Sequence, residues 1–135
     1  ATVVAHALYP DGWNEEQRAF CAQALERQIA IPGFDTLFAE QGGALVGFAF
    51  ANWGFSIRKG APFAHIQLIF TLPAQRRSGI ARHLLQAVRQ LAEARGACRV
   101  ELETDTDNLA ARTLYESCGF ERLPNKEVYM LFFDR

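Results

Sequence analysis

The sequence predicts an α/β protein in which helices pack against a mixed sheet. Two apolar, aromatic runs flank a Gln41-Gly42-Gly43 turn, and an apolar stripe with helical spacing extends over residues 77–95. An alternating segment over residues 98–104 follows that stripe directly. Strand patterns that alternate with helical ones are typical of a layered α/β fold. Because half of the 135 residues are hydrophobic, we expect a single domain over residues 1–135 with a core of its own.

The first elements are a short strand and a helix. Residues 3–8 are apolar and end at the turn-prone sequence Tyr9-Pro10-Asp11-Gly12, which predicts a strand. Over residues 13–28 the apolar positions recur every three or four residues, which predicts a helix that ends before Pro32.

The middle of the chain is expected to supply the centre of the sheet. Residues 36–40 and 44–53 predict an antiparallel hairpin around the glycine turn. Residues 56–62 contain Lys59, Gly60 and Pro62 and are expected to form a loop. Residues 63–71 are almost continuously apolar, as expected of a central strand that is covered on both faces.

The second half begins with the strongest helical pattern. Seven apolar positions between residues 80 and 92 form one stripe, and Gly96 is placed to end the helix. Residues 98–104 then predict a strand, and residues 108–118 predict a second helix with Asp107 or Asn108 as its cap.

The last segment is expected to complete the sheet. Gly119 is placed to end the second helix. Two strands over residues 120–123 and 128–133 are predicted around the Pro124-Asn125-Lys126 turn.

Composition argues against several functional classes. The 14 basic and 15 acidic residues nearly cancel, so no global field is expected to attract the chain to nucleic acid or to an anionic membrane. Three widely spaced cysteines form no pair typical of a zinc site or of a secreted disulfide framework. No apolar run reaches transmembrane length, and the apolar start lacks the basic flank of a signal peptide. We therefore expect no metal and a cytoplasmic protein, and we leave a homodimer open.

The chemically informative segment is Arg76-Arg77-Ser78-Gly79-Ile80-Ala81-Arg82, between the buried strand and the stronger helix. The first backbone N–H groups of a helix have no partner within it, and its dipole is positive there, so a phosphate is favoured. Six arginines and one acid, Glu93, lie between residues 76 and 99. The alternative is that these arginines only solvate the outer face of a helix.

Two motifs resemble those of the GNAT superfamily of N-acetyltransferases. Arg76, Gly79 and Ala81 match the acetyl-CoA signature that opens the pyrophosphate-binding helix of that family. Downstream, the segment from Asn108 through Leu114-Tyr115 to Gly119-Phe120 is similar to the family's second motif. The resemblance extends over roughly residues 34–133 and implies a mostly antiparallel mixed sheet with two central parallel strands that splay apart.

The resemblance also implies acetyl-CoA as co-substrate and suggests which residues hold it. The pyrophosphate would lie on the segment made of Arg76, Arg77, Ser78, Gly79, Ile80, Ala81 and Arg82. The pantetheine arm would pair, like an added strand, with Ile69, Phe70 and Thr71. Asn108 would hold the cofactor near its thioester, although capping the second helix is an equally natural role.

Glu103 and Tyr115 are the candidate catalytic groups. Glu103 is expected near the carboxyl end of a central strand, where ligands of open α/β sheets gather, so a role as general base is implied. The alternative is a structural pair with Arg99 or a neighbouring arginine. Tyr115 would protonate the leaving thiolate, or would merely fill the core. His65 is a second candidate base on the preceding strand.

The implied activity is direct acetyl transfer in a ternary complex to a primary amine, either a small amine or a peptide or protein amine. The alternative is a non-catalytic acyl-CoA-binding regulatory module. In relatives that acetylate small amines and polyamines an acid often stands where this chain has Leu68, which weakens a polycation as acceptor.

Overall fold

A computed structural model describes residues 23, 27, 33–42, 44–72 and 79–134 of the chain. It divides into two compact units, Ala1–Glu103 and Thr104–Arg135. The N-terminal strand expected over residues 3–8 lies outside the described residues. So does the helix expected over 13–28, apart from Gln23 and Arg27, which are helical.

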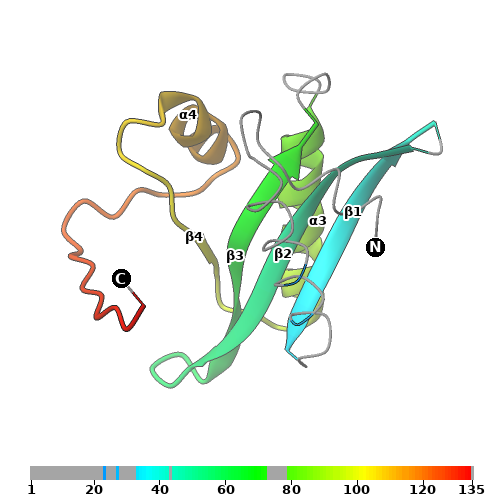
Figure 1. Cartoon of the computed structure of the whole chain (residues 1–135). Helices are drawn as coiled ribbons and strands as arrows, with labels where there is room; N and C mark the ends of the chain where they lie inside the picture. The colour runs from blue at the N-terminus through cyan, green and yellow to red at the C-terminus, as the bar shows by residue number, and fades with distance from the viewer. Residues whose placement is uncertain (1–22, 24–26, 28–32, 43, 73–78, 135) are drawn as a thin grey trace. The chain divides into compact units, whose positions relative to one another are not determined.

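The first unit is built on a four-stranded sheet in the order β1-β2-β3-β4 (Figure 1). Strand β1 (Phe34–Gln41) pairs antiparallel with β2 (Ala44–Ser56). The expected hairpin is therefore confirmed, and both strands are longer than their apolar runs.

The loop that we expected over residues 56–62 is a tight turn. β2 continues to Ser56 and pairs there with Ala61, the first residue of β3 (Ala61–Thr71). The Gly60 amide donates to the Ser56 carbonyl at 2.8 Å, and Gly60 has φ +64°. The left-handed glycine closes the turn, so its flanking residues stay in the β2–β3 ladder.

Strand β4 (Val100–Leu102) makes the sheet mixed, because it pairs in parallel with β3. Helix α3 (Ile80–Ala94) connects β3 to β4 and lies against the sheet (Figure 1). Gly96, with φ +72°, follows its C-terminus as expected. β4 is shorter than the predicted strand over residues 98–104, since its ladder with β3 contains three residue pairs.

The core of the first unit lies between α3 and the sheet. Leu84, Leu85, Val88 and Ala92 are the buried residues of α3. Gly47 is closely packed by both β3 and α3, since a Cβ atom there would lie 2.7 Å from the Phe70 carbonyl oxygen on β3 and 3.0 Å from Ile80 Cγ2 on α3. A glycine at this position therefore permits the helix to pack on the strands.

One polar cluster joins the C-terminal end of α3 to the first hairpin. Asp35 Oδ2 accepts hydrogen bonds from Trp53 Nε1 at 2.6 Å and from Arg95 Nη1 at 2.7 Å. The Arg95 guanidinium also lies 4.4 Å from the centre of the Trp53 ring. The hydrogen bond from Arg95 holds the pKa of the Asp35 carboxyl below its usual value, although partial burial opposes this shift.

The second unit contains helix α4 (Leu109–Ser117), as predicted, with Gly119 at φ +94° after its end. The expected strands over residues 120–123 and 128–133 are absent from the described structure, where these residues form no ladder. Tyr129 and Phe133 are 91% and 94% exposed. A strand pattern forms a strand only where a partner satisfies its backbone groups, and the described residues supply none here.

Candidate functional site

The two parallel strands separate at one point, and this separation defines the candidate site. Their pairing runs from Ala64 with Val100 to Ile66 with Leu102, and β3 then continues without β4 to Thr71. Over residues 68–71, the described structure pairs β3 with β2 alone. Backbone donors and acceptors on the other edge of β3 are therefore available to a ligand.

A bulge in β3 coincides with the separation. In the β2–β3 ladder, Ala51 pairs with Ile66 and Phe50 with Leu68, so Gln67 is an extra residue on β3. Bulges bend a strand and increase its local twist. The bulge therefore accounts for the divergence of β3 from β4. Ile69, Phe70 and Thr71, the expected pantetheine-pairing residues, lie on the open segment beyond it.

The N-terminus of α3 fits a phosphate group. Gly79 precedes the helix with φ +86°, and among the described residues no side chain caps the first turn and no acid lies in it. A Cβ atom at Gly79 would meet nothing within 4 Å, so crowding does not explain the glycine at this position. Its positive φ, which side chains rarely adopt, does explain it. Ile80 and Ala81 are half-buried and Arg82 is exposed. Arg76, Arg77 and Ser78 lie outside the described residues.

Glu101 and Glu103 have different partners, although they lie only two residues apart, Glu101 on β4 and Glu103 directly after it. Glu101 Oε2 accepts a hydrogen bond from Arg99 Nε at 3.1 Å, and the Arg99 guanidinium lies 4.2 Å from the centre of the Phe63 ring. The structural pair with Arg99 that we considered for Glu103 therefore belongs to Glu101.

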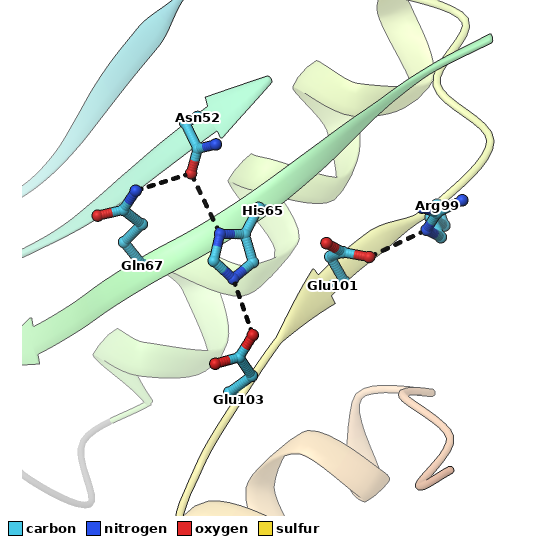
Figure 2. A network of polar contacts seen from close by, with 6 residues as sticks. All are labelled: Asn52, His65, Gln67, Arg99, Glu101 and Glu103. Atoms are coloured by element: carbon cyan, nitrogen blue, oxygen red, sulfur yellow. Dashed lines mark hydrogen bonds and ion pairs between the residues drawn. The ribbon is translucent and has the colours of Figure 1, made fainter. Parts of the chain in front are cut away.

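Glu103 instead contacts His65, so the two candidate bases lie together (Figure 2). The Glu103 Oε1 atom is 3.5 Å from His65 Nε2. The His65 side chain is 24% exposed and that of Glu103 is 68% exposed. Glu101 on β4 is the register partner of His65. Glu103 lies two residues further along, directly after β4, and this position brings its carboxylate to the His65 ring.

Two amides that we did not consider from the sequence complete this network. His65 Nδ1 lies 3.2 Å from Asn52 Oδ1, and Gln67 Nε2 donates to the same oxygen at 3.0 Å (Figure 2). A polar residue inside the apolar run of residues 44–53 was the available signal for Asn52. The position of Gln67 depends on the bulge, which the sequence pattern did not indicate.

The two candidates in the second unit are placed by α4. Asn108 Oδ1 accepts a hydrogen bond from the Ala111 amide at 3.1 Å, which confirms Asn108 as the cap of this helix. A role in cofactor binding would therefore fall to its amino group. The Tyr115 ring is half-buried, with its centre 6.0 Å from that of Phe120. Burial raises the pKa of the Tyr115 phenol above its usual value near 10.0, so the hydroxyl stays protonated at neutral pH.

The described residues show few other candidate groups. Among them, no three His, Cys, Asp or Glu side chains gather closely enough to hold a metal ion. No helix within the described part is both long and apolar enough to cross a membrane.

Comparisons with known proteins agree with the fold and with the resemblance. The chain is 39% identical to the N-alpha-acetyltransferase RimI of Mycobacterium tuberculosis over 108 residues, which are 78% of this chain and 64% of that protein. It is 36% identical to a mycothiol acetyltransferase of Brachybacterium faecium over 113 residues, which are 80% of this chain and 33% of that protein. The chain thus spans less than two thirds of the length of either relative.

A solved structure has the same fold. The ribosomal-protein-alanine N-acetyltransferase of Brucella melitensis biovar Abortus matches 96% of this chain and 85% of its own, with a TM-score of 0.71 at 23% identity. The model of the acetyltransferase (GNAT) family matches residues 5–120. Because this match includes most of the chain and both motifs, the protein belongs to the acetyltransferase (GNAT) family.

Proposed function

We propose that the chain is an acetyl-CoA-dependent N-acetyltransferase that acts on a primary amine. The observation that carries this proposal is the separation of β3 from β4, which leaves an open strand edge beside the carboxylate of Glu103. Family membership supplies the reaction class, and both relatives named above are acetyltransferases. We propose further that both units belong to one domain, since the family match crosses their boundary at residue 103.

The residues of the site fit acetyl-CoA, which supplies the acetyl group as a thioester. The first turn of α3, with Arg82 and the preceding residues 76–78, would hold its pyrophosphate. The open edge of β3 at residues 69–71 would hydrogen-bond the amides of the pantetheine arm, and Asn108 would bind near the thioester.

In the proposed reaction, Glu103 accepts a proton from the acceptor amine, directly or through water. The amine nitrogen then forms a bond to the acetyl carbon, and the carbon–sulfur bond breaks. Tyr115 donates its phenolic proton to the departing thiolate. The Tyr115 phenol is protonated at neutral pH, so it can act as a proton donor.

The acceptor is proposed to be a small amine or a peptide or protein amine, since one relative is named an N-alpha-acetyltransferase and the other a mycothiol acetyltransferase. We also propose that the protein functions in the reducing cytoplasm, and the free thiols of Cys98 and Cys118 are consistent with this location.

The test is to incubate the protein with acetyl-CoA and a panel of amines and peptides while measuring released thiol and product mass. Transfer to at least one primary amine is expected. Tight acetyl-CoA binding by calorimetry without transfer to any amine would favour the alternative, a non-catalytic acyl-CoA-binding regulatory module.

A further inference from the structure

The histidine beside Glu103 has a partner at each of its ring nitrogens. Nδ1 of His65 faces Asn52 Oδ1 at 3.2 Å, and Nε2 faces Glu103 Oε1 at 3.5 Å. Asn52 lies on β2 and Glu103 directly follows β4, so the two partners hold the ring from the two sides of β3. A histidine without a functional role does not require a partner at both ring nitrogens.

The amides determine which ring nitrogen carries the hydrogen. Asn52 Oδ1 already accepts a hydrogen bond from Gln67 Nε2 at 3.0 Å. A carbonyl oxygen only accepts hydrogen bonds, so the contact with His65 requires a hydrogen on Nδ1. The bulge at Gln67 brings this second donor to the same oxygen.

This assignment leaves a lone pair on Nε2 of the neutral ring, and that lone pair faces a carboxylate oxygen. Two acceptors attract each other only when a proton lies between them. At 3.5 Å the contact is longer than a formed hydrogen bond and would shorten when the proton arrives. The neighbouring carboxylate of Glu101 is held by Arg99. In the described part of the first unit, Glu103 is therefore the carboxylate that contacts the ring.

We propose that His65 and Glu103 act as a single proton acceptor, with Asn52 and Gln67 as positioning residues that hold the His65 hydrogen on Nδ1. This proposal rests on the transferase function proposed above. When the amine nitrogen bonds to the acetyl carbon, its N–H bond breaks and the proton passes to Glu103. It is then shared with Nε2 of His65 and leaves to solvent through the exposed Glu103 carboxylate.

The first experiment examines the ring itself and does not depend on activity. Nitrogen NMR of the full chain labelled at histidine distinguishes the two neutral tautomers of His65. We expect hydrogen on Nδ1 in the parent protein and a mixture of tautomers in the folded Asn52→Leu variant. Hydrogen on Nε2 of the neutral ring in the parent protein would overturn the proposal.

The second experiment is the pH dependence of kcat/KM for His65→Gln, with His83→Gln as a control on the exposed side of α3. At neutral pH we expect a loss of about tenfold or more for His65→Gln, with unchanged acetyl-CoA Kd, and little effect of His83→Gln. The loss should shrink as the pH rises, because hydroxide replaces the missing acceptor. An equal loss at every pH would indicate a purely structural role and contradict the proposal. If the parent protein acetylates no amine, the proposed function fails, while the NMR result still stands on its own.

Discussion

Replacing Asp35 tests how the unit that carries the site is held together. Its carboxylate accepts from Trp53 at 2.6 Å and from Arg95 at 2.7 Å, both short for N–H···O bonds. Hydrogen bonds to a charged group contribute about 1.5–3 kcal/mol when buried, and exposed ion pairs contribute less than about 1 kcal/mol. The Arg95 and Asp35 side chains are 42% and 34% exposed, so the lower part of this range applies.

We therefore expect Asp35→Ala to lower the free energy of unfolding by about 2 kcal/mol, because it removes both contacts. Asp35→Asn retains an acceptor for Trp53 and should cost about 1 kcal/mol. Thermal unfolding followed by circular dichroism measures both. For a chain of this size, about 2 kcal/mol corresponds to a fall in Tm of roughly 6–10 °C. Glu93→Ala, which breaks the exposed pair with Arg89, serves as the control and should change Tm little.

The pH dependence gives a second check of the same cluster. The pKa of Asp35 is lowered in the folded protein, chiefly by the hydrogen bond from Arg95. The stability that the ionised carboxylate contributes is thus complete above the unfolded pKa of about 3.9 and is lost as the pH falls through the lower folded value. The gap between the parent and Asp35→Asn should be constant near neutral pH and close in acid. Equal stability of the two proteins at pH 7, or a gap that widens in acid, would refute the reasoning.

Three further predictions concern packing, the cofactor and the proton donor. Gly47→Ala should destabilise the protein by about 1–3 kcal/mol in thermal unfolding, since the new methyl would lie 2.7 Å from the Phe70 carbonyl oxygen on β3 and 3.0 Å from Ile80 Cγ2 on α3; an unchanged Tm would contradict this close packing around Gly47. Gly79→Asp should raise the Kd for acetyl-CoA at least about tenfold by calorimetry, and more than the neutral Gly79→Asn, which tolerates the same φ of +86°. Equal affinities of these two variants for acetyl-CoA would indicate that the pyrophosphate does not bind at this turn. Tyr115→Phe should lower kcat by about tenfold or more with little change in Tm, because the ring keeps its packing on Phe120. A kcat within about twofold of the parent, with chemistry rate-limiting, would mean that water protonates the thiolate.

The local elements of this fold could be predicted because their signals lie within short stretches of sequence. The apolar stripe of α3 and the glycine turn between β1 and β2 each specify an element without distant partners. The sequence predicts a loop where the structure has a tight turn after Ser56, because Lys59 and Gly60 are common in both. The ladder on either side of the turn is set by β2–β3 pairing, which no local pattern shows. The prediction of two C-terminal strands was wrong for a related reason. An alternating pattern alone does not provide a hydrogen-bonding partner for the backbone.

The candidate site was only partly accessible from the sequence. Glu103 and His65 could each be identified as candidate bases from residue type and strand position. Their contact depends on the parallel register that pairs His65 with Glu101, which lies 36 residues away in the chain and is not encoded by any local pattern. The same holds for Asn52, whose amide reaches His65 only through the β2–β3 register.

The most direct test of the central claim compares Glu103→Gln with Glu101→Gln, two identical substitutions at positions two residues apart, Glu101 on β4 and Glu103 directly after it. The proposed mechanism predicts that Glu103→Gln lowers kcat/KM for acetyl transfer about a hundredfold at neutral pH, with recovery at higher pH and an unchanged Kd for acetyl-CoA. Glu101→Gln should stay within about threefold of the parent, because its carboxylate is engaged by Arg99 away from the reaction. Equal losses in the two variants, or a Glu103→Gln protein with the pH–rate profile of the parent, would contradict the account.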